Sequence, residues 1–242
     1  MVFQVKSKLI PGKNKNTKLK RTAIVLLLGL LCLFLYVEIV NIHSKNMTVR
    51  QKILKAFYPA LMGVTKFFGK KSAMQANTSM VKPPVSFYSL HIADNRGSEI
   101  KFEDFKGKKV LLVNTASECG YTPQYHELQE LYEQNKNKLV ILGFPANDFG
   151  EQEKGTDHEI ESFCRANYGV SFPLARKSTV IKGENQNPIF EWLTHKNENG
   201  WNEQPPTWNF SKYLIDEQGT LINYFDPSLS PLGDEIQAAV HR

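Results

Sequence analysis

The hydrophobic pattern separates an N-terminal arm from a longer region in which strand and helix signals alternate. Residues 23–37 form an unbroken apolar run. Beyond Glu38, three further apolar residues extend this run to about the 20 residues that cross the hydrocarbon core of a bilayer. We therefore predict a transmembrane helix over 23–42, after a basic segment over 1–22. A cleaved signal peptide is the alternative, although no small-residue cleavage site follows the run.

The basic residues on the two sides of this run predict its orientation. Seven Lys and Arg residues precede the run and four lie within the next 20 residues. The excess favours a cytoplasmic N-terminus and an exported domain, as in a single-pass protein of a bacterial inner membrane. If translation instead starts at Met47, the anchor is absent and the protein is cytoplasmic.

Residues 43–84 are expected to form a basic amphipathic segment and a linker. Within them, residues 47–71 carry apolar side chains at helical spacing and six Lys and Arg residues. This pattern is typical of a helix lying on an anionic membrane surface, or equally of a helix packed on the domain. Pro59 is expected to kink or split that helix. Residues 72–86, rich in Ser, Asn and Gln with two prolines, are expected to be the linker.

Residues 85–242 are expected to form one α/β domain. Short apolar or alternating runs predict strands at 87–93, 100–102, 110–115, 139–144, 213–215 and 221–225. Helices are expected to begin at Thr122-Pro123 and at a capping box from Thr156 to Glu159, with Gly169 ending the second. A parallel β-α-β unit followed by a hairpin and a final helix predicts a thioredoxin-like fold, with a central mixed sheet flanked by helices.

Composition and charge exclude several classes of function. The chain has 242 residues and a net charge of +6, which divides into +14 for residues 1–82 and −8 for residues 83–242. An acidic domain argues against nucleic-acid binding. Only three cysteines are present, none in a CxxC pair and none at zinc-ligand spacing with histidine, so we expect no metal and no cofactor.

Cys119 is the first candidate for chemistry. It lies between the predicted strand 110–115 and the start of the next helix, where the helix dipole favours thiolate over thiol. A thiolate attacks peroxides, so this position suits a redox nucleophile. The alternative is an inert buried cysteine, and Glu118 would oppose a low pKa if its carboxylate pointed inward.

Four sequence blocks extend this interpretation. They are VNTASECGYTPQY (113–125), LGFPANDFGEQE (142–153), SFCRANYGVSFP (162–173) and WNFSKYLID (208–216). In order and spacing they resemble the glutathione peroxidase family, and together they cover essentially all of residues 85–242. Residues 1–82 lie outside the resemblance.

The resemblance implies a role for several residues. Cys119 falls on the peroxidatic position, and Gln152, Trp208 and Asn209 fall on the other members of the family's catalytic tetrad. Their amide and indole N–H groups are neutral donors that would stabilise a thiolate and pass a proton to the departing oxygen. Cys164 matches the resolving cysteine of members that use thioredoxin. It would condense with oxidised Cys119 to form a disulfide, and its helix is expected to unravel locally. A buried structural Cys164 is the alternative.

Two departures from the family pattern are present. Ala146 stands where many relatives have a cysteine, and Asp148 replaces a glutamine. No long insertion precedes Trp208, which favours a monomer. The three acidic residues Asp157, Glu159 and Glu161 are expected to form a solvated helix face.

Together these observations predict a membrane-anchored thiol peroxidase that acts in the response to oxidative stress. Its expected substrates are hydrogen peroxide and organic or lipid hydroperoxides, and its expected reductant is a thioredoxin-like protein or glutathione. The alternative function is a peroxide sensor or relay that passes a disulfide to a client protein.

Overall fold

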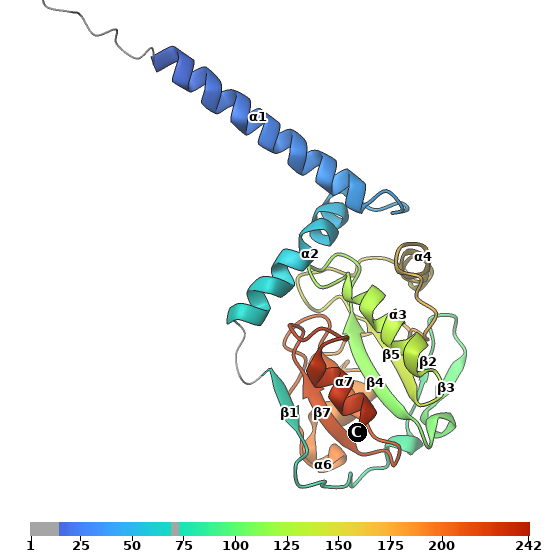
Figure 1. Ribbon diagram of the computed structural model, residues 1–242. Helices are drawn as coiled ribbons and strands as arrows, with labels where there is room; N and C mark the ends of the chain where they lie inside the picture. The colour runs from blue at the N-terminus through green and yellow to red at the C-terminus, as the bar shows by residue number, and fades with distance from the viewer. Residues whose placement is uncertain (1–14, 69–72) are drawn as a thin grey trace, which may run out of the picture.

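The computed structural model describes residues 15–68 and 73–242, in which a helical arm leads into an α/β body (Figure 1). The arm consists of α1 (Lys15–Val40) and α2 (Val49–Phe68). Helix α1 extends away from the body (Figure 1). Its stretch Leu19–Val40 is the one helix in the described residues that is long and apolar enough to cross a membrane, and none of its most apolar window is buried.

A five-stranded mixed sheet forms the centre of the body, with strands in the order β1-β7-β6-β4-β5. Strands β4 and β5 pair in parallel, and the other neighbours pair antiparallel. Their bounds are β1 (Met74–Ala76), β4 (Lys109–Thr115), β5 (Leu139–Pro145), β6 (Lys212–Ile215) and β7 (Leu221–Phe225). A separate hairpin joins β2 (His91–Ala93) to β3 (Glu99–Lys101). Every residue of β4 and β5 is buried, as expected for central strands that are covered on both faces.

Side chains that alternate along these strands feed two hydrophobic cores. On one face Leu111 and Val113 pack with helices α3 (Gln124–Asn135), α4 (Asp157–Tyr168) and α7 (Asp234–His241). On the other face Val110 and Leu112 pack with α5 (Pro188–Thr194) and with two 3-10 segments, η1 (Phe87–Ser89) and η2 (Phe102–Phe105). A short helix, α6 (Lys196–Asn199), follows α5. The thioredoxin-like fold that the sequence predicts is confirmed.

Three local predictions are wrong. Residues 87–89 form a 3-10 turn instead of a strand, because Phe87 packs edge-on against Phe102 in the second core. Helix α3 begins at Gln124, after the predicted Thr122-Pro123 start. Residues 72–86, expected to be a linker, contain β1, which pairs with the edge of β7.

Helix α2 continues through Pro59, so the predicted split is wrong. The helix packs on the body, since its Gln51 side chain donates to the Ser117 carbonyl and its Tyr58 hydroxyl donates to the Glu127 carboxylate. Of the two interpretations of residues 47–71, packing on the domain is the one that the structure shows for 47–68, and residues 69–71 lie outside the described residues.

Candidate active site

Cys119 lies in the tight loop between β4 and α3. The Thr122 hydroxyl accepts a hydrogen bond from the Cys119 N–H at 2.9 Å and donates one to the Ala116 carbonyl at 2.8 Å. The Glu118 N–H donates to the Gln152 carbonyl at 3.0 Å, which joins this loop to the segment after β5. These bonds fix the direction of the Cys119 side chain, and the sequence had suggested Thr122 only as a helix cap.

The Cys119 thiol is buried, at 1% exposure, and lies among hydrogen-bond donors. The Tyr121 N–H points at its sulfur at 3.4 Å. Burial raises the pKa of Cys119, while the Tyr121 N–H, the side chains of Asn209 and Trp208 and the Gly120 N–H act in the opposite direction. The net lowering expected from a helix N-terminus is therefore wrong, because α3 begins five residues later and desolvation outweighs the donors.

Asn209 links residues that the sequence predicts to form a catalytic tetrad. It is fully buried, and its amide N–H₂ donates to the Gln152 side-chain oxygen at 3.1 Å. Trp208 is 39% exposed, and its ring packs against Phe149 with centroids 5.5 Å apart. The structure thus brings Trp208 and Asn209 to the sulfur, and it joins Gln152 to the group through Asn209.

The Trp208–Asn209 segment is held in place by a residue that the sequence analysis missed. The Asn114 side-chain amide of β4 donates to the Trp208 carbonyl at 3.1 Å, and its backbone carbonyl accepts from the Phe210 N–H at 2.6 Å. Phe210 has a φ of 68°, a left-handed conformation that is uncommon outside glycine. Asn114 and Phe210 together fix the turn that points Asn209 toward Cys119.

Cys164 is fully buried on α4 and, like Cys119, is a free cysteine. Burial strongly raises its pKa, and an interaction with the Tyr125 side chain opposes that shift. Both sulfurs belong to the same hydrophobic core and are not bonded to each other.

Comparison with known proteins agrees with this geometry. The family model described as glutathione peroxidase matches residues 87–194. The Glutathione peroxidase-like peroxiredoxin 2 of Saccharomyces cerevisiae is 43% identical over 160 residues, which cover 65% of this chain and 98% of that protein. The chain belongs to the glutathione peroxidase family.

Other relatives of this glutathione peroxidase family member cover a similar share of the chain. The Glutathione peroxidase homolog BsaA of Staphylococcus epidermidis is 46% identical over 147 residues, covering 60% of this chain and 92% of that protein. The crystal structure of Trgpx in apo form has 32% identity and a TM-score of 0.50, covering 65% of this chain and 94% of its own. The protein is therefore a peroxidase, as its motifs predict.

Glu153 is a buried acid of this peroxidase that sequence reasoning missed. It is 1% exposed, and its carboxylate accepts a hydrogen bond from the Ser117 hydroxyl at 3.1 Å. Burial raises the pKa of Glu153 to about 8, and the Ser117 hydrogen bond and the charge of Lys177 only partly oppose this. Its position beside Gln152 in the sequence gives no signal that it would be buried.

The raised pKa of Glu153 predicts that the stability of the protein depends on pH. The Glu153→Gln substitution should remove this contribution. Between pH 4.5 and about 8 the folded state retains a proton that the unfolded state releases. The free energy of unfolding should therefore fall as pH rises through this window, by at most about 1.4 kcal/mol for each pH unit. Chemical denaturation of both proteins at pH 5, 6, 7 and 8 measures the difference.

The comparison with the variant is needed because Lys212 titrates in the same range. Burial lowers the pKa of Lys212 to about 7, so its contribution to stability rises with pH above that value. Both proteins share this contribution, and subtraction removes it. Glu151→Gln, at a neighbouring exposed acid, is the control and should keep the wild-type slope. Parallel curves for wild type and Glu153→Gln would contradict the prediction.

The departures from the family pattern have structural explanations. The Asp148 carboxylate accepts a hydrogen bond from the Val180 N–H at 2.7 Å and so secures a neighbouring loop. Ala146 is fully buried and supplies no thiol. The indole N–H of Trp201, in the other Trp-Asn pair of the chain, donates to the Leu221 carbonyl at 2.7 Å, as a structural residue would.

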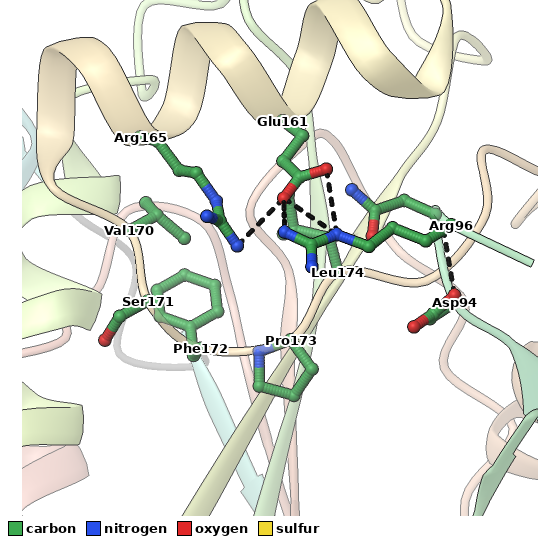
Figure 2. A pocket seen from close by; sticks show the side chains of 10 residues that line it. Asp94, Arg96, Glu161, Arg165, Val170, Ser171, Phe172, Pro173 and Leu174 are labelled. Carbon is green, nitrogen blue, oxygen red and sulfur yellow. Dashed lines mark hydrogen bonds and ion pairs between the residues drawn. The ribbon is translucent and has the colours of Figure 1, made fainter. Parts of the chain in front are cut away.

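The predicted solvated acidic face of α4 is only partly correct. Glu161 retains 15% side-chain exposure and lies between Arg96 and Arg165, with which it forms ion pairs at the edge of a pocket (Figure 2). Glu159 completes the predicted capping box with Thr156, and Asp157 accepts from the Lys177 N–H at 2.7 Å. Among the described residues no group of three His, Cys, Asp or Glu side chains could hold a metal ion.

Proposed function

We propose that Cys119 is the peroxidatic residue of a thiol peroxidase that reduces hydrogen peroxide and organic or lipid hydroperoxides in the response to oxidative stress. The convergence of donors on its sulfur carries this proposal. The Tyr121 N–H from the Cys119 loop meets the side chains of Trp208 and Asn209 from a segment almost 90 residues away. Neutral donors stabilise an anion at this point without themselves having to ionise.

The first chemical step follows from this arrangement. The Cys119 thiolate attacks one oxygen of the hydroperoxide, and the O–O bond breaks. Sulfur is oxidised to a sulfenic acid, and the peroxide is reduced to water or an alcohol once the departing oxygen takes up a proton. Asn209 and Trp208 are placed to stabilise the thiolate, and Gln152 orients the Asn209 amide through their shared hydrogen bond.

Cys164 is proposed to resolve the sulfenic acid. Its thiolate attacks the Cys119 sulfur, an S–S bond forms, the S–O bond breaks, and the oxygen leaves as water after protonation. A protein with a reactive dithiol then reduces the disulfide by exchange. Because the S. cerevisiae relative is a peroxiredoxin by name, a thioredoxin-like reductant is favoured over glutathione.

The apolar stretch Leu19–Val40 is proposed to anchor the enzyme in a membrane. Its side chains are exposed along almost the whole helix, which is unfavourable in water and favourable in lipid. A signal sequence has the same composition, so fractionation of the full chain must separate the two. An anchored protein remains in the membrane pellet after a carbonate wash, whereas a cleaved one appears in the soluble fraction with a shorter mass.

The assignment of Cys164 predicts a specific mass change. After one equivalent of hydrogen peroxide, the detergent-solubilised full chain should lose two hydrogens and yield a peptide that joins Cys119 to Cys164. The Cys164→Ser variant should instead gain one oxygen on Cys119, because no thiol remains to condense with the sulfenic acid. Mass spectrometry of the intact chain and of its peptides measures both.

A Cys32→Ser background makes this result unambiguous, since Cys32 is exposed on α1 and is the only other thiol. Added oxygen in both proteins would assign Cys164 a structural role and direct the search to glutathione or a client protein. Unchanged masses in both would contradict the peroxidatic assignment of Cys119.

A further inference from the structure

We propose that α2 is a clamp that holds the peroxidatic loop and the end of the resolving helix in their reduced arrangement. It must release α4 before the Cys119–Cys164 disulfide can close. The inference rests on the proposed roles of these two cysteines. Its basis is that one helix, which follows the candidate membrane span in the chain, contacts both the Cys119 loop and the end of α4.

The first set of contacts is on the peroxidatic loop. The Gln51 side-chain amide donates to the Ser117 carbonyl at 3.2 Å, two residues before Cys119. The Arg50 guanidinium lies 3.8 Å from the Glu118 carboxylate, so Glu118 faces α2. On the other side of Cys119, a β-carbon built at Gly120 would come within 3.3 Å of the Leu61 side chain. Helix α2 therefore lies directly against the loop.

The second set of contacts is on the C-terminal end of α4. The Asn167 side chain accepts from the Lys45 N–H at 2.7 Å and donates to the Lys45 carbonyl at 3.1 Å. The Lys55 ammonium lies 5.7 Å from the centroid of the Tyr168 ring, within the range of a cation–π interaction. The arm thus contacts two consecutive residues of the last helical turn after Cys164.

A third contact joins α2 to the start of α3. The Tyr58 hydroxyl donates to the Glu127 carboxylate, which also accepts from the Ser230 hydroxyl. Burial and the charge of Glu127 raise the pKa of Tyr58, so its hydroxyl remains a donor at neutral pH. Tyr58 is remote in sequence from both cysteines and tests the clamp independently of α4.

Disulfide formation requires part of α4 to move. A disulfide needs an S–S distance of about 2 Å and Cα atoms within about 7 Å, whereas both cysteines are free in this structure. The capping box fixes the N-terminus of α4, and the Glu161–Arg96 pair fixes its second turn (Figure 2). The segment that can unwind without breaking these contacts follows Glu161, and α2 with its preceding turn holds the end of that segment.

The clamp predicts that weakening α2 docking accelerates the resolving step alone. Asn167→Ala removes the paired bonds to Lys45, and Tyr58→Phe removes the bond to Glu127 while retaining the ring. Each full chain, in detergent micelles, is mixed with hydrogen peroxide, acid-quenched and analysed by mass for sulfenic acid and disulfide. We expect disulfide formation to be about three- to tenfold faster in each variant, as the loss of one or two hydrogen bonds implies.

Sulfenic acid formation should remain unchanged, because neither residue touches the Cys119 sulfur. Val49→Ala, on the same helix at a site that is 74% exposed, is the matched control and should resolve at the wild-type rate. Acceleration in Asn167→Ala alone would overturn the clamp, since that residue also bonds to Phe163 within α4. Unchanged resolution in both variants would overturn it as well.

Hydrogen exchange gives a second test that needs no substitution. If α2 is released with α4, amides of residues 50–62 should exchange faster in the disulfide form than in the reduced form. Equal exchange in the two forms would overturn the inference. Failure of the proposed function is recognised separately, because the wild-type chain would then form no Cys119–Cys164 disulfide at all.

Discussion

Cys119→Ser is expected to lower the second-order rate constant for hydrogen peroxide by at least about 10³-fold. A serine hydroxyl remains protonated at neutral pH, and the donors around position 119 cannot make it ionise. The oxygen is also a much weaker nucleophile toward peroxide oxygen than a thiolate sulfur. Peroxide consumption by the full chain, followed with a saturating dithiol reductant, measures the loss.

Two variants show that this loss comes from the nucleophile and not from the fold. Cys32→Ser removes the exposed thiol of α1 and should keep the wild-type rate. Cys164→Ser should keep the rate of the first oxidation, because that thiol acts only in the second step. If Cys119→Ser retained a tenth of the wild-type rate, another group would have to be the site of oxidation.

The sequence predicts the central strands well and the peripheral ones poorly, for a physical reason. Strands β4 and β5 are continuous apolar runs because both faces of the sheet are covered, and such runs are visible in the sequence. Strand β1 has three residues and exists only because it pairs with β7. The 3-10 turn at 87–89 depends on the packing of Phe87 against distant rings, which local periodicity does not encode.

The candidate site, too, could be predicted only in part from the sequence. Motifs identify Cys119, Trp208 and Asn209, and the structure places the three together. The direction of the pKa shift at Cys119 could not be predicted, because it depends on how much protein covers the sulfur. The burial of Glu153 could not be predicted either, since a carboxylate next to a polar residue in the sequence is usually solvated. The amphipathic pattern of α2 could not distinguish a membrane surface from the surface of its own domain, since both offer an apolar contact.

Asn209→Ala is expected to reduce the rate of Cys119 oxidation by about 10²-fold at neutral pH, the usual loss when one preorganised donor is removed. Asn209 is fully buried and lies between the sulfur and the Gln152 side chain. Its loss removes one of the interactions that oppose the burial-induced rise in the pKa of Cys119, and it also releases Gln152. The thiol pKa should therefore rise further, and the activity profile should shift to higher pH.

The pH profile separates this electrostatic role from simple loss of structure. The rate of Cys119 alkylation, measured from pH 6 to pH 10, should be low in Asn209→Ala at neutral pH and approach the wild-type rate at the alkaline end. A misfolded site would lose reactivity at every pH. Asn185→Ala, at an exposed asparagine, is the control and should match the wild-type profile. An unshifted profile with a uniformly lower peroxidase rate would instead indicate that Asn209 acts on the departing oxygen, after the thiolate has already formed.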